Sequence, residues 1–326
     1  MTLHLTYVGP RFIVTVGDRR LTVSNDGTIT EFDAYANKSV VVLGIGCAVV
    51  VSYTGLAHID GASTANWIAE QVMARKLPES RLLGEGNPIE FAPQEVPHLG
   101  EIIARLCRAL ERDLPRQQVR DRHVEVSIAG YVSKRHWRVA PSDPRNSRPI
   151  FLSLKHRGER RRKTKVQTFP KMWGEPSRFK IYRIGTRVPD GIQDELAEAL
   201  CASGGQTLDA VETLLVEAVR KTSRVCSTVG TDCMTIHLVP VDRRMHIMFD
   251  RDPSRTVAAF TPVIAGADLL APPAIMRGST FPQLASGAWS IGLGVHPPLP
   301  TPLRHLNGPP IPVFEMGAHP QKPFMS

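Results

Sequence analysis

The chain has few cysteines and no long apolar run, and each of these shortages excludes a class of protein. Its 326 residues include five cysteines and 6% aromatic residues. The cysteines are scattered, odd in number and without a Cys-x-x-Cys pair, which argues against a disulfide framework or a zinc site. No apolar run reaches the roughly 18 to 20 residues of a membrane span, and no secretory signal pattern opens the chain. We therefore expect a cytoplasmic protein without membrane contact, and nothing indicates a metal or an organic cofactor.

The remaining composition is that of an ordinary globular protein. With 42% hydrophobic and 22% charged residues, bulk disorder is excluded. Lys and Arg exceed Asp and Glu by nine, which raises the question of nucleic-acid binding. The most basic segment, 157–165 (RGERRRKTK), has no interleaved aromatic residues and lies between predicted strands. This pattern favours a solvated loop over a nucleic-acid contact, and an acidic protein partner stays open.

Apolar periodicity predicts strands, a helix pair, strands, a second helix pair and strands again. Helices are predicted over 62–77, with Ser63 as cap, and from 99 to near Pro115; two more cover 190–202 and the segment from Thr207 to Lys221. The segment 24–37 is mostly polar, and we predict that it connects two pairs of strands. The predicted strands are 3–18 and 38–55, each a pair around a turn, then 123–132, 148–156, 178–185, 233–241 and 244–250.

This order predicts the fold class and the domain division. The first strands are apolar nearly throughout, as expected for strands covered on both faces. Two sheets face to face, with helices on both outer sides, would bury every apolar face. We therefore predict an α/β (α+β) protein, a four-layer αββα sandwich over residues 1–250. Residues 251–326 are crowded with prolines and predict an irregular C-terminal extension.

The second residue carries the chemistry that we expect. Methionine aminopeptidase removes Met1 when the next residue is small, and Thr2 qualifies. Thr2 would then hold a free α-amine beside its own hydroxyl, so that the hydroxyl can attack a carbonyl while the amine accepts its proton. The reference pKa of such an amine, about 7.7–8.0, leaves a useful neutral fraction at physiological pH.

Hairpin geometry adds partners for Thr2. A turn at Gly9-Pro10-Arg11 predicts that Thr2 lies opposite Asp18, where directly opposed side chains are close neighbours. A second hairpin centred on Ile45 brings Lys38 near Ser52 at the same kind of strand end. His4 lies close enough to modulate access to Thr2, but nothing in the sequence marks it as a base.

With these residues the sequence resembles the proteasome-like N-terminal nucleophile hydrolases, which include the 20S proteasome β subunits and bacterial relatives without a propeptide. The resemblance covers roughly residues 2–250. It rests on the initial Met-Thr, on Asp-x-Arg sixteen residues after the nucleophile, and on the segments RFIVTVGDRRLT, SYTGLAHIDG, YRIGTRVP and STVGTDCMTIHLVP.

The resemblance implies hydrolysis of peptide or amide bonds through an ester on Thr2, with Asp18 orienting Lys38 and the charge of Lys38 lowering the pKa of the Thr2 amine. It also implies a homo-oligomer, a ring or an open spiral. The supporting positions that it implies are Gly55 as oxyanion donor, Arg20 of the Asp-x-Arg motif, Thr186, and Ser227 or Thr228.

One departure supports a second hypothesis. The family keeps an acidic residue three positions before the serine of its Ser-Gly-Gly segment, and the matching stretch here, 223–230 (SRVCSTVG), contains no carboxylate. The alternative is therefore a catalytically inactive subunit of the same fold that serves as an assembly or interaction module.

Overall fold

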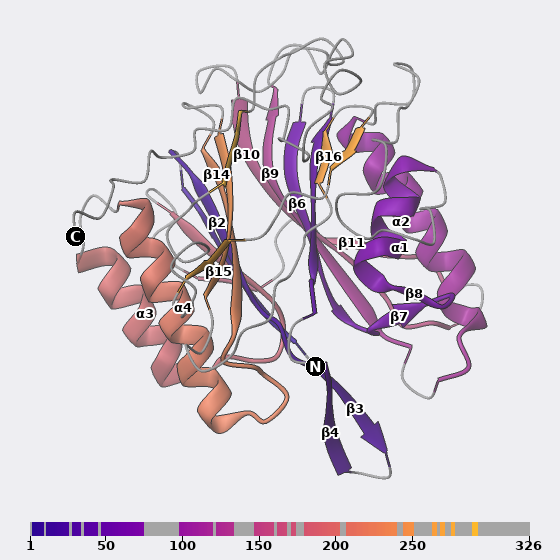
Figure 1. The fold of residues 1–326 in the computed structure, drawn as a ribbon, viewed down its shortest axis with the longest axis horizontal. Coiled ribbons are helices and arrows are strands. Elements are labelled where there is room, and N and C mark those ends of the chain that lie inside the picture. The colour runs from indigo at the N-terminus through magenta and orange to yellow at the C-terminus, as the bar shows by residue number, and fades with distance from the viewer. Residues whose placement is uncertain are drawn as a thin grey trace, which may run out of the picture.

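The structure is a computed structural model with two large sheets and two helix pairs (Figure 1). It describes residues 2–9, 11–25, 28–33, 36–44, 47–74, 98–119, 122–133, 147–159, 162–167, 171–173, 179–202, 207–239, 244–250, 263–265, 268–270, 275–277 and 289–292.

The first sheet contains both strands of the N-terminal hairpin. Its order is β12 (Lys171–Trp173), β13 (Lys180–Gly185), β1 (Leu3–Val8), β2 (Ile13–Asp18), β14 (Cys233–Val239), β15 (Arg244–Asp250) and β18 (Ile275–Arg277), and β19 (Trp289–Gly292) also pairs with β15. Every pair in it is antiparallel except that of β15 with β18.

The second sheet contains the valine-rich hairpin. Its order is β11 (Lys165–Gln167), β10 (Ser147–His156), β9 (Val124–Ser133), β6 (Cys47–Gly55), β5 (Ser39–Gly44), β16 (Val263–Ala265) and β17 (Asp268–Leu270). Only β5 and β16 run parallel here. The predicted mixed α/β class is confirmed, with mainly antiparallel sheets.

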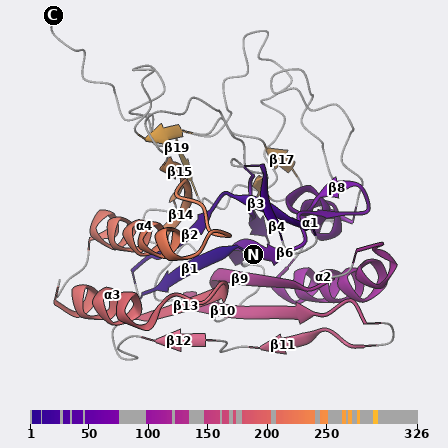
Figure 2. The same cartoon turned by 90° about the horizontal axis from the view of Figure 1, so that it is seen from below.

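The helices begin where the sequence predicts them. They are α1 (Thr64–Met73), α2 (Leu99–Asp113), followed by a 3₁₀ turn at Leu114–Arg116, α3 (Asp190–Ala202) and α4 (Leu208–Val225). The side chains of Ser63 and Thr207 accept the N–H groups of Asn66 and Ala210 and cap α1 and α4. In both views α3 and α4 lie on one side of the sheets and α1 and α2 on the other (Figures 1 and 2). None of the helices in the described ranges is long and apolar enough to cross a membrane.

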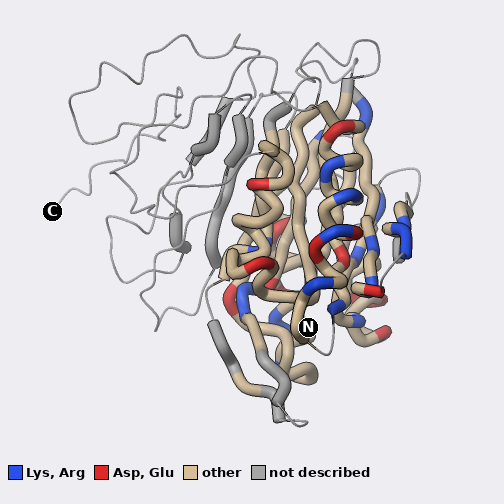
Figure 3. The backbone as a smooth tube through the Cα atoms, turned by 90° about the vertical axis from the view of Figure 1, so that its right-hand side faces the viewer, with Lys and Arg blue, Asp and Glu red and all other residues tan. Residues whose placement is uncertain are grey.

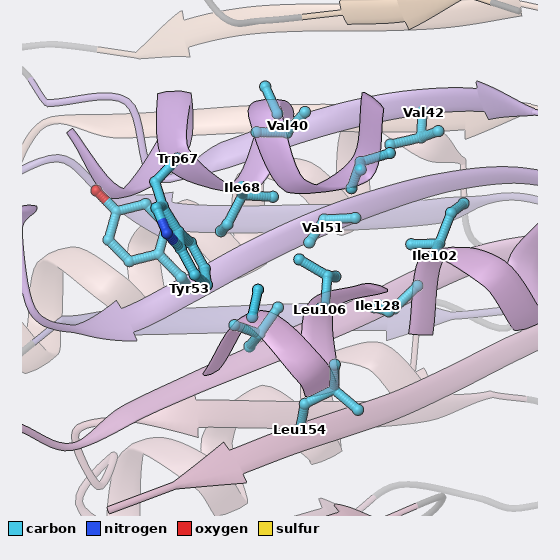
Figure 4. Close-up of a cluster of buried hydrophobic side chains, with 14 of the residues drawn as sticks. Val40, Val42, Val51, Tyr53, Trp67, Ile68, Ile102, Leu106, Ile128 and Leu154 are labelled. Carbon is cyan, nitrogen blue, oxygen red and sulfur yellow. The ribbon is translucent and has the colours of Figure 1, made fainter. Parts of the chain in front are cut away.

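Three apolar clusters hold these elements together. One joins α1 and α2 to the second sheet and includes Trp67, whose Nε1 donates to Asp113 at 3.1 Å (Figure 4). A second joins α3 and α4 to the first sheet through residues such as Leu3 and Leu5. The third lies between the sheets and includes Val8. Since β1 contributes to both faces of its sheet, its burial explains the nearly continuous apolar run.

Two features differ from the sequence prediction. The predicted polar stretch forms a hairpin of β3 (Leu21–Asn25) and β4 (Thr28–Asp33), which extends from the body near the N-terminus (Figure 1). In the C-terminal extension, β16, β17, β18 and β19 add to the two sheets. The rest of 251–326 lies outside the described residues. The small strands β7 (His58–Ile59) and β8 (Ala62–Ser63) precede α1.

The described part of the basic run is engaged with acidic side chains. Arg162 pairs with Glu159, and Lys163 reaches Glu111 of α2 at 3.2 Å. Figure 3 shows basic and acidic residues interleaved on the side that carries α1 and α2. Surface pairs of this kind contribute little to stability.

Candidate active site

Thr2 lies one residue before β1, and its backbone is fixed from two directions. Its carbonyl oxygen accepts the N–H of Thr186 at 2.8 Å. The next N–H, that of Leu3, donates to Oδ1 of Asp18 at 2.7 Å. Thr2 itself is 4% exposed. The start of β1 is therefore tied both to β13 and to the end of β2.

The register of the first hairpin differs by one residue from the prediction. The N–H of Gly9 donates to the carbonyl of Phe12 at 3.1 Å and closes the turn around two central residues. Continued to the start of the chain, the resulting register places Thr2 opposite Arg19 and not opposite Asp18. Asp18 is nevertheless close to Thr2, because its carboxylate accepts the backbone N–H of Leu3, the next residue.

The second hairpin shows the same one-residue difference. Ser39 pairs with Ser52, so Lys38 lies opposite Tyr53, whose N–H donates to the Lys38 carbonyl at 3.1 Å. Lys38 is 1% exposed although it is the last residue before the strand. A solvated lysine at a strand start would be the ordinary arrangement, and this one is instead directed into the protein.

Asp18 and Lys38 form a buried ion pair. Lys38 Nζ lies 3.1 Å from Oδ2 of Asp18, and it also donates to the carbonyl of Arg20. The same carboxylate accepts the N–H groups of Leu3, Arg20 and Gly230 at 2.7, 3.1 and 3.0 Å. Four donors thus hold one carboxylate, as a buried charge requires.

Arg20 secures the loop that supplies one of those donors. Its Nη1 donates to the carbonyl of Ser227 at 3.1 Å. Ser227 is exposed, and Oγ1 of Thr228 lies 3.2 Å from Sγ of Cys226. The loop binds Arg20 through the carbonyl of Ser227 and Asp18 through the N–H of Gly230, both of them backbone atoms. The hydroxyl roles predicted for Ser227 and Thr228 stay predictions.

Two glycines with positive φ lie where chains approach closely, Gly185 at Thr2 and Gly55 at His123. Gly185 has φ +80°, and a Cβ there would lie 1.8 Å from the carbonyl oxygen of Thr2 and 2.9 Å from Cγ2 of Thr54. Gly55, next to Thr54 at the end of β6, has φ +107°. Because Thr54 and Thr2 both approach one point at Gly185, the strand end that carries Gly55 lies beside Thr2.

Thr186 offers a hydroxyl at this point. It lies next to Gly185, and its backbone N–H already binds the Thr2 carbonyl. Its Oγ1 is buried and has no hydrogen-bond partner within the described ranges. A buried hydroxyl without a partner has the capacity to bind a further polar group beside Thr2.

Two buried charged residues were missed from the sequence. Arg19, 0% exposed, and Asp232, 3% exposed, are joined by a 3.0 Å bond from the N–H of Arg19 to the Asp232 carbonyl. Together with Thr186 and Thr2 they form one row across β13, β1, β2 and β14. The carboxylate of Asp232 lies two residues after the segment 223–230, which contains no carboxylate of its own. Its position directly before an apolar strand was the signal available in the sequence.

His4 is a further buried polar residue near Thr2. It is 2% exposed, and burial together with the charge of Lys38 lowers its pKa from 6.5 to about 3. An interaction with the backbone of Tyr53 raises the pKa of His4, but the effects of burial and of Lys38 are larger. His4 is therefore neutral at physiological pH, and the buried cations of this region include Lys38, Arg19 and Arg183, whose Nη1 donates to the Gly185 carbonyl at 2.8 Å.

The comparisons with known proteins concern the whole chain. No family model and no curated protein matches it. Among solved structures it is similar to Anbu from Hyphomicrobium sp. strain MC1, with 13% identity, 73% of this chain and 82% of that chain covered, and a TM-score of 0.44.

Two further structures are similar at the same level. Anbu (ancestral beta-subunit) from Yersinia bercovieri has 14% identity, coverage of 73% and 81%, and a TM-score of 0.43. The helical assembly of the Anbu complex from Pseudomonas aeruginosa has 11% identity, coverage of 73% and 81%, and a TM-score of 0.41. Similarities this distant carry no argument about activity, which must come from the residues of this chain.

The residues around Thr2 do not suggest a metal centre. Within the described ranges, no three His, Cys, Asp or Glu side chains are grouped so that they could hold a metal ion. The arrangement brings together a hydroxyl, a buried ammonium, a fixed carboxylate and backbone donors, which suits nucleophilic chemistry assisted by proton transfer.

The neutral state of His4 predicts a pH dependence of stability. In the unfolded chain His4 takes up a proton near pH 6.5, whereas the folded protein does so only near pH 3. Stability from His4 is thus complete above pH 6.5 and decreases as the pH falls. We expect about 2–3 kcal/mol of unfolding free energy to be lost between pH 7 and 4.5. Urea titrations of wild type and His4→Phe measure this; the same pH dependence in both would contradict it.

Proposed function

We propose that the chain is a proteasome-like N-terminal threonine hydrolase with the four-layer αββα sandwich of that class, acting on peptide or amide bonds. Thr2 is the nucleophile after Met1 is removed. The observation that carries the proposal is the connection of Thr2 to a buried ion pair: the residue after Thr2 donates to Asp18, and Asp18 binds Lys38 at 3.1 Å. A buried lysine and aspartate have a cost, which a catalytic use of their charges explains.

The first step forms an ester on Thr2. Its Oγ1 attacks the substrate carbonyl, and the proton of the hydroxyl passes to the α-amine of Thr2, which then protonates the leaving amine. The positive charge of Lys38 favours the neutral amine and stabilises negative charge on the oxygen. Asp18 keeps Lys38 in place.

The second step releases the product. The N–H of Gly55, at the strand end beside Thr2, helps to hold the oxyanion, and donors of this type contribute about 3–4 kcal/mol when aimed at it. Water then attacks the ester carbonyl, and the Thr2 hydroxyl is restored. Thr186 Oγ1 supports the α-amine, and Arg20 maintains the loop that binds Asp18.

An inactive assembly or interaction subunit is the second candidate. It is favoured by the absence of a carboxylate in 223–230, the stretch where the resemblance places one. Asp232 lies in the same row as Thr2 and argues for the hydrolase. In either case we propose a cytoplasmic homo-oligomer of this chain.

Covalent labelling separates the two candidates. Intact mass of the native protein should show Thr2 as the first residue, and a peptide epoxyketone or a β-lactone should add one equivalent, located on Thr2 by tandem mass spectrometry. Lys38→Met keeps the length of the side chain without its charge and should label at least about tenfold more slowly. If residues before Thr2 are retained, or if the wild-type protein reacts with neither probe, the threonine hydrolase is excluded and the inactive subunit is the remaining candidate.

A further inference from the structure

His4 shares a strand face with Thr2. Residues two apart on a strand point to the same side and lie roughly 6.6 Å apart. Leu3 and Leu5 belong to the cluster under α3 and α4, whereas Val8 belongs to the cluster between the sheets. His4 therefore follows Thr2 on the face that is directed toward the second sheet.

The ring of His4 lies against the backbone of the neighbouring strand. Gly17 pairs with His4, and a Cβ at Gly17 would lie 2.2 Å from Cε1 and 2.3 Å from Nδ1 of the ring. Any other residue at this position would displace the imidazole. A glycine inside a central strand often marks such a close approach, and here it fixes the place of the ring.

The His4 ring lies beside the backbone of Tyr53 and keeps the capacity to bind a further partner. The residue is buried, the backbone of Tyr53 lies near its ring, and no hydrogen bond of normal geometry joins Nδ1 or Nε2 to the described residues. Leaving such a group unsatisfied costs about 1–3 kcal/mol, so buried polar atoms are rarely left in this state without a use. A neutral imidazole presents one donor and one acceptor, which is the pattern that a water molecule can bind.

We propose that His4 is a positioning residue that holds the water molecule which hydrolyses the Thr2 ester. The inference rests on the proposed function. In this step the water oxygen bonds to the ester carbonyl carbon, and its proton passes to the α-amine of Thr2. The bond from the carbonyl carbon to Oγ1 then breaks, the amine returns the proton to Oγ1, and a carboxylic acid leaves. His4 accepts a hydrogen bond from the water and takes no proton.

If His4 positions the water molecule, its substitution should affect ester hydrolysis but not ester formation. Attack by Thr2 on the substrate needs no water, so His4 should matter little for ester formation. Hydrolysis needs a placed water, and misplacing it should slow that step alone. A merely structural role would slow both steps together, because it would disturb Thr2 itself.

A β-lactone tests this directly, since it forms an ester with Thr2 whose appearance and loss are both followed by intact mass. His4→Phe keeps a flat ring without nitrogens, and we expect ester formation within threefold of wild type and ester loss at least tenfold slower. His4→Gln, which keeps a donor and an acceptor, should restore most of the rate of loss. Far-UV circular dichroism and thermal unfolding check the fold; if His4→Phe does not fold, His4→Leu carries the same test.

The outcomes distinguish this inference from the proposed function. Equal rates of ester loss in wild type and His4→Phe, or formation and loss slowed by the same factor, would overturn the role of His4 while Thr2 remains the nucleophile. Wild type that forms no ester would remove both the proposed function and this inference.

Discussion

Thr2→Ala is expected to lower kcat/KM for a fluorogenic peptide substrate by about 10⁴-fold or more, because the attacking hydroxyl is lost and nothing beside it replaces a nucleophile. The fold should be retained. The contacts that fix Thr2 come from its backbone carbonyl and from the N–H of Leu3, and alanine preserves both. Steady-state assays together with urea unfolding measure the two effects separately.

Thr2→Ser is the matched control. Serine keeps the hydroxyl and the α-amine and also permits removal of Met1, so activity should stay within about tenfold of wild type if only the nucleophile matters. Turnover by Thr2→Ala close to that of wild type would assign the hydrolysis to another group and would contradict the mechanism.

Asp18→Asn should lower the free energy of unfolding by about 3–5 kcal/mol, because Lys38 would remain as a buried cation without its counter-charge. Lys38 is 1% exposed at its side chain and Asp18 is 0% exposed, so water screens neither. Asparagine has one acceptor oxygen in place of two, so the N–H of Leu3 at Oδ1 or the N–H of Gly230 at Oδ2 would face an amide NH2 group. The midpoint and slope of urea unfolding report the loss.

A surface pair supplies the comparison for Asp18. Arg187 and Asp190 make a 2.7 Å contact with side chains that are 72% and 71% exposed, so Asp190→Asn should change stability by less than about 1 kcal/mol. The double variant Asp18→Asn with Lys38→Met should recover part of the loss, since it removes the uncompensated charge. An Asp18→Asn protein as stable as Asp190→Asn would refute the buried-pair account.

The sequence predicted the regular elements well where one pattern dominated. The apolar stripe of α2 and the caps Ser63 and Thr207 are local signals, and the helices begin where those signals are. The β3–β4 hairpin was missed although its sequence holds Asp26-Gly27, a strong turn signal, because the flanking residues are mostly polar. The short strands β16–β19 were missed because they pair only with edges of sheets that distant segments build.

The candidate site was predicted in part. Asp18 and Lys38 do meet, but each hairpin register is one residue from the predicted one, because a turn with two central residues cannot be told from one with three by apolar pattern alone. Arg19 and Asp232 meet across two strands that are more than two hundred residues apart in the chain, which no local pattern reports.

By itself the sequence determined the mixed α/β class, the order of strands and helices, and the hydroxyl at residue 2 with an aspartate and a lysine near it, since each follows from local pattern and short-range hairpins. The tertiary structure alone decided which groups are buried together. Burial of Lys38 against Asp18 and of His4 against Gly17 depends on two sheets closing over the start of β1. Burial also removes water from these charges, and it is this loss of solvent that gives them their electrostatic effect.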